Sequence, residues 1–341
     1  MKSEGPYVDQ YFDFVEKIGK GSNSTVFKVI EKRTKKVLAL KKLKPRVKTK
    51  DEPDFEIAAH CVLKDENIVK LNGKFVCKRD SSTYLIFDYY DYDLFSVIHD
   101  NSSKQLSKDL IKSLSFQLLK AVDCCHKHNV LHRDIKPENI MITRDGVLKL
   151  GDFGYAFKGD PSLKKSTNVI TPSYRPPEIL LGDQYYLFPS DIWSVGCVIY
   201  ELLTGKALFR PENFTVESQL DKILSIIGTP SNEEIKTKFS VAVPTNINHY
   251  DSCLHNYLIN EISDEFSEFR ELLEKILIFN PENRLTASQL LQLPIFSGIT
   301  VERIPITFFV SQNSISPNLS SPEIKYSGII RPQLPKLVLA E

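Results

Sequence analysis

The chain has 341 residues, 42% of them apolar, and its 44 basic and 43 acidic residues leave a formal net charge of +1. This length supports a large core shared between two domains or lobes, and the balanced charge argues against nucleic acid or an anionic membrane as the main partner. The N-terminus has no apolar leader-like run, and the most apolar later stretch, 192–203, contains Glu201 and is too short to cross a bilayer. We therefore expect an intracellular protein.

Short runs of alternating apolar and polar residues occupy the region from Tyr11 to Asp88. Glycines and charged turns separate the runs, which predicts a small, mostly antiparallel sheet. One helix, from about Pro53 to Leu63, is predicted to interrupt this sheet, with Pro53 in its first turn. The runs are FDFVEKIG, STVFKVIE, KVLALKKL, NIVKLNGKFV and TYLIFDY.

A glycine pair lies between the first two predicted strands, in the segment Ile18, Gly19, Lys20, Gly21, Ser22, Asn23, Ser24, Thr25 and Val26. Taken alone, this spacing favours a plain hairpin. The third predicted strand ends at Lys41, which alternation turns inward with Ala39. We interpret the basic run that follows as a solvated loop rather than a nuclear-import or nucleic-acid patch. The run comprises Lys42, Lys44, Arg46, Lys48 and Lys50.

After Asp88 the apolar spacing becomes helical. The first long helix has a predicted buried stripe of Leu110, Ile111, Leu114, Leu118, Ala121, Val122 and Cys125. A second helix is predicted to begin with Ser190 as its N-cap and to end at Gly205. From about Val301 the composition shifts to Ser, Pro and Asn, which predicts a tail of low order, partly packed on the helical part.

The most specific pattern is HRDIKPEN, from His132 to Asn139, followed by Asp152-Phe153-Gly154. It supplies two acids, an amide and a lysine, the groups that phosphoryl transfer needs to hold metal ions, neutralise charge and orient a nucleophile. Together these motifs resemble the catalytic loop and DFG motif of eukaryotic protein kinases. The resemblance covers about residues 11–298 and implies the two-lobed α+β protein kinase fold. It divides the chain into an N-terminal extension (1–10), a small β lobe (11–88), a hinge (89–92), a large α lobe (93–298) and a tail (299–341).

The resemblance implies binding of ATP and Mg²⁺ between the lobes. The segment from Ile18 to Val26 would cover the nucleotide, with Gly19 and Gly21 at the phosphates and Val26 over the adenine. Lys41 would hold the α and β phosphates with Glu56 as its partner; Glu52 is the weaker alternative. Ala39, Asp88 and the bulky Phe87 would line the adenine pocket.

In the large lobe, the resemblance implies that Asp134 orients the substrate hydroxyl and accepts its proton, while Lys136 neutralises the transferring phosphoryl group. Asn139 and Asp152 would hold the magnesium ions. Lys136 is typical of serine/threonine kinases rather than tyrosine kinases. Asp191 would brace the backbone of the catalytic loop.

The stretches YRPPEILLG, SDIWSVGCVIYELLTGKALF and IIGTP are similar to the branch that holds cyclin-dependent, mitogen-activated and casein kinase II enzymes, and most similar to the cyclin-dependent group. Arg175 would bind the carbonyl of Val169 and leave a pocket that favours proline after the target Ser or Thr. Glu178 would pair with a buried Arg284. A role in cell-cycle or transcription control, in the nucleus or cytoplasm, is the corresponding expectation.

Three departures concern regulation and specificity. The small-lobe helix lacks the PSTAIRE-like sequence that engages cyclins, so a cyclin-like subunit on that helix remains a hypothesis. Phe55 and the stretch 155–157 replace two arginines that normally join Arg133 around an activating phosphate, so a phosphate on Ser166 or Thr167 should raise activity only modestly. Pro172 and Ser173 replace bulkier residues of the substrate loop and should shift substrate preference.

Three alternatives stay open. A mitogen-activated kinase would carry Thr-x-Tyr in the activation segment, and a casein kinase II relative would carry tryptophan in the middle of DFG; this chain has neither. A pseudokinase scaffold is disfavoured because the five residues Lys41, Glu56, Asp134, Asn139 and Asp152 are all present. The six cysteines lack CxxC spacing and the histidines lack metal-ligand spacing, so neither zinc nor disulfides are expected.

Overall fold

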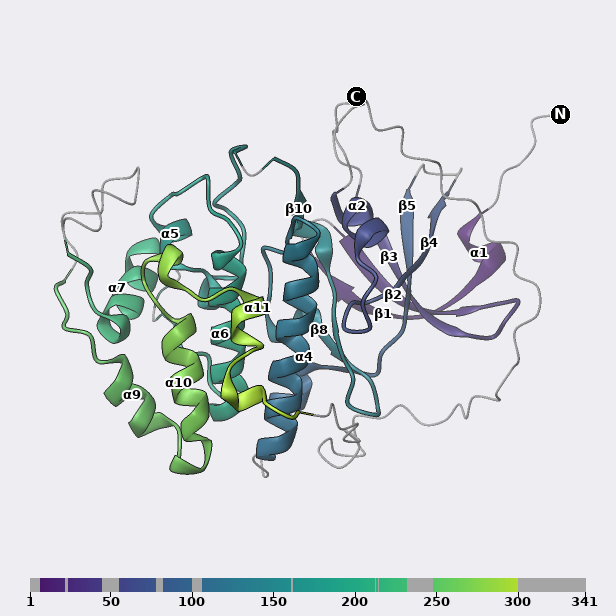
Figure 1. The fold of residues 1–341 in the computed structure, drawn as a ribbon. Coiled ribbons are helices and arrows are strands. Elements are labelled where there is room, and N and C mark those ends of the chain that lie inside the picture. Colours follow the sequence, from purple (N-terminus) through teal and green to yellow (C-terminus); the bar gives the residue numbers. More distant parts are fainter. Residues whose placement is uncertain are drawn as a thin grey trace.

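The structure, a computed structural model, describes residues 7–21, 24–44, 55–77, 82–99, 106–160, 162–211, 213, 215–231 and 248–299. A strand-rich lobe and a larger helical lobe lie side by side (Figure 1). The two-lobed α+β fold is therefore confirmed. The predictions for Ser22, Asn23, Glu52, Pro53, residues 45–50 and the tail from residue 300 concern residues outside this description.

The small lobe is built on a five-stranded antiparallel sheet in the order β1-β2-β3-β5-β4. The pairing of β2 with β3 sets Val26 opposite Lys41, and that of β3 with β5 sets Ala39 opposite Phe87. The elements are α1 (Val8–Tyr11), β1 (Phe12–Lys20), β2 (Ser24–Glu31), β3 (Val37–Leu43), α2 (Phe55–Val62), β4 (Leu71–Val76) and β5 (Thr83–Asp88). Helix α2 thus ends one residue before the predicted Leu63.

The large lobe is mainly helical. Its helices are α3 (Leu94–His99), α4 (Lys108–Lys127), α5 (Pro177–Leu180), α6 (Pro189–Thr204), α7 (Val216–Ile227), α9 (Leu254–Glu261), α10 (Ser267–Ile276) and α11 (Ala287–Leu290). Short strands are β6 (Tyr92–Asp93), β7 (Val130–Leu131), β8 (Ile140–Ile142), β9 (Leu148–Leu150) and β10 (Phe157–Lys158). Single 3₁₀ turns are η1 (Pro137–Asn139), η2 (Phe153–Tyr155), η3 (Pro172–Tyr174), η4 (Asp264–Phe266), η5 (Pro281–Asn283) and η6 (Pro294–Phe296).

Helix α4 confirms the predicted stripe, since all seven of its predicted core residues are buried. Its N-cap, Ser107, accepts a hydrogen bond from the Leu110 amide, which satisfies one of the free donors of the first turn. Within the described residues no helix combines the length and apolarity needed to span a membrane.

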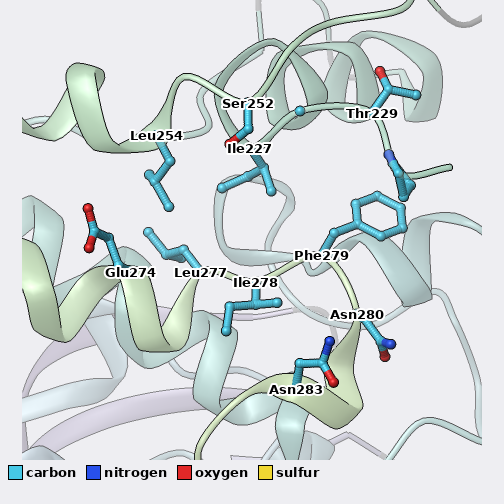
Figure 2. A pocket seen from close by; sticks show the side chains of 12 residues that line it. Ile227, Thr229, Ser252, Leu254, Glu274, Leu277, Ile278, Phe279, Asn280 and Asn283 are labelled. Atoms are coloured by element: carbon cyan, nitrogen blue, oxygen red, sulfur yellow. The ribbon is translucent and has the colours of Figure 1, made fainter. Parts of the chain in front are cut away.

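A pocket of about 350 Å³ lies between the ends of α7 and α10 and the start of α9 (Figure 2). Apolar side chains, among them Ile227, Leu254 and Phe279, form much of its wall, with Asn280 and Asn283 beside them. None of the predicted site residues lines this pocket.

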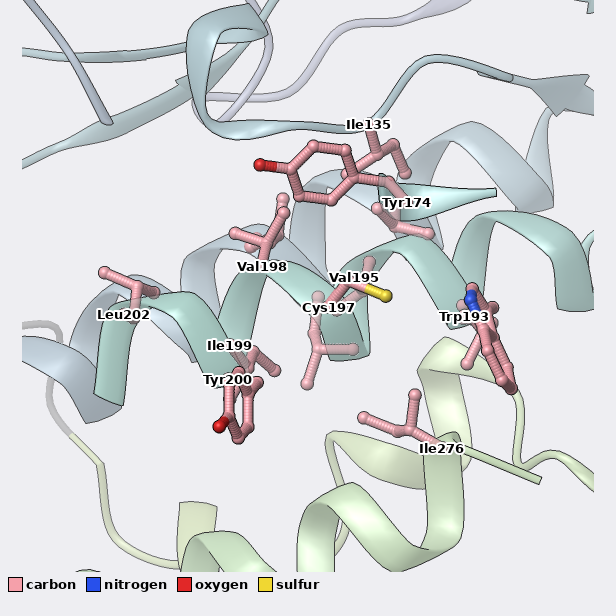
Figure 3. Packing of buried hydrophobic residues seen from close by; sticks show 14 of the residues in the cluster. Ile135, Tyr174, Trp193, Val195, Cys197, Val198, Ile199, Tyr200, Leu202 and Ile276 are labelled. Atoms are coloured by element: carbon pink, nitrogen blue, oxygen red, sulfur yellow. The ribbon is translucent and has the colours of Figure 1, made fainter. Parts of the chain in front are cut away.

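Helix α6 is the centre of the large-lobe core and is buried on all sides (Figure 3). A Cβ on Gly196 would lie 2.5 Å from Cγ2 of Ile276, so a glycine here allows α10 to approach closely. The helix ends at Gly205 as predicted, with a left-handed φ of 70°. The prediction of Ser190 as the N-cap is wrong: the helix begins at Pro189 without a side-chain cap, and the amides of Ser190 and Asp191 bind the carbonyls of Leu187 and Phe188.

Candidate active site

The two lobes meet at Lys41 on β3. Its ammonium nitrogen lies 2.5 Å from Glu56 Oε1 on α2 and 2.7 Å from Asp152 Oδ1. The predicted pairing of Lys41 with Glu56 is thus confirmed. Lys41 is buried, whereas its neighbour Lys42 is only partly buried and lies over the Tyr84 ring, as the strand alternation predicts.

Opposite charges within the triad of Lys41, Glu56 and Asp152 set the pKa values of its lysine and its aspartate. Desolvation alone would lower the pKa of Lys41, but Asp152 and Glu56 raise it above its ordinary value. Desolvation would conversely raise the pKa of Asp152, yet the nearby Lys41 ammonium and the Gly154 amide lower it. The lysine is therefore a cation and the aspartate an anion at neutral pH.

The described residues of the glycine segment lie at the end of β1 and the start of β2. Gly21 donates its amide to the Ser24 carbonyl at 3.0 Å, and Ser24, where the resemblance would place a third glycine, is buried. Ile18 is 43% exposed, Lys20 is exposed, and Thr25 and Val26 are half-buried.

At the predicted adenine pocket, Phe87 is buried in a cluster with Leu85 and Val69, against which the partly buried Ala39 and Met141 pack. Asp88 does not point its carboxylate into this cluster. Its Oδ1 accepts from Lys36 at 2.6 Å and from Asn72 at 2.9 Å, and although desolvation opposes them, these contacts lower the pKa of Asp88. Any nucleotide contact by Asp88 would therefore come from its backbone.

The catalytic loop brings four polar groups together. Asn139 donates its side-chain amide to Asp134 Oδ2 at 2.8 Å and to the Asp134 carbonyl at 2.8 Å. The Lys136 ammonium lies 3.3 Å from Asp134 Oδ2 and donates to the Thr171 hydroxyl at 2.9 Å. That hydroxyl donates in turn to Asp134 Oδ1 at 3.1 Å. Both carboxylate oxygens of Asp134 are thus fixed by the surrounding groups.

Asp191 on α6 braces the backbone of this loop, as predicted. Its carboxylate accepts the amides of His132 and Arg133, each at 2.9 Å, and lies 3.0 Å from His126 Nε2. Burial alone would raise the pKa of Asp191, but these contacts lower it. They also stabilise the left-handed φ of 66° at Arg133, which is unfavourable for a residue with a Cβ.

Four aromatic rings form a continuous column behind the site. The His60 ring on α2 lies 5.3 Å from the Phe87 ring and 4.9 Å from the Phe153 ring, and Phe153 lies 4.7 Å from His132, measured between centroids. His60 is buried, and no hydrogen-bond partner for its Nε2 lies among the described residues. Burial lowers the pKa of His60 to about 3.

One prediction about the substrate loop is wrong in its detail. Arg175 donates from Nε and Nη2 to the carbonyl of Ile170, at 3.1 and 2.8 Å, and not to that of Val169. Ile170 has a left-handed φ of 62°, a conformation that β-branched residues rarely adopt. This local conformation redirects the carbonyl groups and gives Arg175 a different acceptor.

The predicted pair of Glu178 and Arg284 is confirmed. Two bonds of 2.8 Å join the guanidinium to the carboxylate, and both side chains are at most 1% exposed. Arg284 also donates to the carbonyls of Ile278, Phe279 and Pro189. This pair ties α5 to η5 beneath the substrate loop.

The sequence reasoning missed Thr171, His60 and Lys165. Thr171 follows directly after Ile170 and precedes the PSYRPPE stretch, a position that could have suggested a contact with the catalytic loop. His60 stands one turn after Glu56, so its inward direction was readable from helical spacing. For the buried Lys165 we find no sequence signal.

The donor set fits magnesium bound together with a nucleotide. Asn139 uses its amide nitrogen for Asp134, so its side-chain oxygen is the group that remains for a metal. Asp152 supplies a carboxylate whose side chain is 45% exposed. Mg²⁺ takes one or two such oxygens and completes its shell with phosphate and water.

A comparison with known protein families matches residues 12–296 to the protein kinase domain. The match spans both lobes and contains every predicted site residue.

Proposed function

The chain belongs to the protein kinase family, and from this premise we propose that it is an active serine/threonine kinase that transfers the γ-phosphoryl group of ATP to proteins. The observation that carries the proposal is the joint geometry of the Lys41, Glu56 and Asp152 triad with the Asp134, Lys136 and Asn139 cluster. A pseudokinase scaffold would not need to keep the Lys41 triad and the Asp134 cluster in positions that suit catalysis.

Each residue has a role that its contacts support. Asp134, oriented by Asn139 and Thr171, would accept the proton of the substrate hydroxyl, and Lys136 would stand beside the transferring group. Lys41, held by Glu56, would bind the α and β phosphates. Asn139 and Asp152 would hold Mg²⁺, which neutralises phosphate charge when bound.

We further propose a proline-directed enzyme of the cyclin-dependent type. Arg175 occupies the Ile170 carbonyl with two hydrogen bonds, which supports a pocket without a spare acceptor beside the substrate backbone. Proline has no amide hydrogen and suits such a pocket. Lys136 bonded to Thr171 supports serine/threonine specificity. A cyclin-like subunit on α2, a cell-cycle or transcription role and an intracellular location in the nucleus or cytoplasm belong to the same proposal.

The test uses the purified full chain with Mg-ATP and peptides in which serine or threonine is followed by proline or by alanine. We expect preferred incorporation into the proline peptides, and a loss of about 10²–10⁴-fold in Asp134→Asn, because a general base contributes about that much. Equal phosphate incorporation by the wild-type chain and Asp134→Asn would contradict catalysis by Asp134. Equal use of both peptide sets would contradict proline direction, and full activity of the chain alone would contradict a required subunit.

A further inference from the structure

Two phenylalanines meet where the resemblance would place two phosphate-binding arginines. Phe55 begins helix α2, and Phe157 begins β10, the strand that pairs with β7 just before the catalytic loop. Their ring centroids lie 5.4 Å apart at an interplanar angle of 42°. The contact joins α2 directly to the start of the activation segment.

Two cations lie against the Phe157 ring. The Arg133 guanidinium is 5.7 Å from the Phe157 centroid, and the Lys165 ammonium is 5.2 Å from it. Lys165 also lies 5.7 Å from the Tyr186 ring and is only 4% exposed. Aromatic faces attract cations, and the attraction is stronger where water is excluded.

Hydrogen bonds extend this cluster into the activation segment. Arg133 donates from Nε to the Tyr155 carbonyl at 2.6 Å and from Nη1 to the Tyr186 hydroxyl at 3.1 Å. That hydroxyl donates to the Ser166 carbonyl at 2.6 Å. None of these contacts uses a side-chain oxygen of Ser166 or Thr167, the groups that a phosphate would occupy.

We propose that Phe157 is a positioning residue for phosphoryl transfer, whose ring holds Arg133, Lys165 and helix α2 together in place of an activating phosphate. Helix α2 carries Glu56, the partner of Lys41, and Arg133 precedes Asp134, so the ring links both halves of the site. The chain is then active with an unphosphorylated activation segment. This inference rests on the proposed kinase function.

The experiment compares the wild-type chain, Phe157→Leu and Phe157→Tyr, all treated with a broad phosphatase and checked by mass. Leucine keeps an apolar side chain of somewhat smaller volume but lacks the aromatic face, whereas tyrosine retains that face. We expect kcat to fall about 10-fold in Phe157→Leu, because both Arg133 and Lys165 lose their aromatic partner, while the tyrosine variant stays within about 3-fold of wild type. Phe75→Ala, which removes a half-buried ring of the small lobe, is the matched control and should keep its kcat.

Amide hydrogen exchange over residues 157–170 gives a readout that does not depend on activity. We expect exchange there to be about 10-fold faster in Phe157→Leu than in wild type or Phe157→Tyr. Equal kcat and equal exchange in the leucine and tyrosine variants would overturn the proposal. Loss of wild-type kinase activity after phosphatase treatment would also overturn it. A wild-type chain inactive in every phosphorylation state contradicts the kinase function instead, and the exchange comparison then still decides the role of Phe157.

Discussion

His60 has unfavourable surroundings for an imidazole. Its ring fills a gap between Phe87 and Phe153, but burial of Nε2 without a partner among the described residues costs free energy. A charged imidazole would be costlier still, beside Lys41 and within an apolar column. The folded arrangement of the site is therefore most stable while the His60 ring is neutral.

This predicts a pH dependence of unfolding. The pKa of His60 is about 3 in the folded chain and about 6.5 in the unfolded one, so between these values the unfolded state binds the extra proton. Its contribution to the free energy of unfolding should fall by about 1.4 kcal/mol per pH unit as pH drops below about 6.5. Denaturant unfolding at a series of pH values measures this slope.

His60→Leu should remove that part of the slope and, at pH 7, raise the free energy of unfolding by about 1 kcal/mol, because the unpaired nitrogen is gone. His249→Gln, at an exposed histidine, is the control and should leave the slope unchanged. A leucine variant with the wild-type pH profile would show that His60 is not buried as a neutral group.

At the scale of elements, the pair of Glu178 and Arg284 joins α5 to η5 through two bonds that water does not reach. Ser190 of α6 also donates to Glu178 at 2.9 Å, so three elements depend on one carboxylate. Removing one partner would leave the other charge buried without compensation.

We predict that Arg284→Leu lowers the free energy of unfolding by about 3–5 kcal/mol, whereas adding Glu178→Leu recovers much of the loss. Thermal or urea unfolding of both single variants and the double variant gives the coupling energy. Strictly additive effects of the two substitutions would mean that the ion pair contributes nothing to stability.

Kinase activity should depend only weakly on the hydroxyl groups of Ser166 and Thr167 in the activation segment. Tyr186 binds the backbone carbonyl of Ser166, and the Ser166 hydroxyl accepts only a 3.2 Å bond from the nearby Asn168 amide among the contacts described. We predict that the double variant Ser166→Ala, Thr167→Ala retains activity within about 100-fold of wild type, roughly 2.7 kcal/mol. A larger loss in a peptide assay would show that a phosphate on this segment is needed.

At the scale of the whole molecule, the two lobes contact each other where the nucleotide would bind. The salt bridge of Lys41 with Asp152 and the bridge of Ile68 with Leu150 join the sheet lobe to the helical lobe. A ligand that contacts both lobes stabilises both against unfolding.

Mg-ATP should therefore raise the melting temperature of the full chain, with stabilisation of about 2.7 kcal/mol when its concentration is 100 times Kd. Asp152→Asn should lose the magnesium-dependent part of this shift, because the carboxylate is a proposed metal ligand. Asp251→Asn, at an exposed acid, should keep it. An undiminished magnesium effect in Asp152→Asn would remove Asp152 from the metal site.

The sequence alone was sufficient wherever local pattern or motif spacing carried the information. Helical periodicity predicted the buried stripe of α4, strand alternation predicted the inward Lys41, and motif order predicted the partners of Glu178 and Asp191. The start of α6 was missed because no side chain caps it: the backbone carbonyls of Leu187 and Phe188 accept the amides of Ser190 and Asp191.

Only the tertiary structure decided how distant residues meet. The left-handed backbone at Ile170 determines which carbonyl accepts the hydrogen bonds of Arg175. Thr171 lies between Asp134 and Lys136 and bonds to both. Phe55 reached Phe157 across about a hundred residues of chain, an encounter that no local pattern encodes. The sequence determined the reaction, since its chemistry depends on residue types in fixed motifs; the fold determined what holds those motifs in place, since that depends on packing between separate elements.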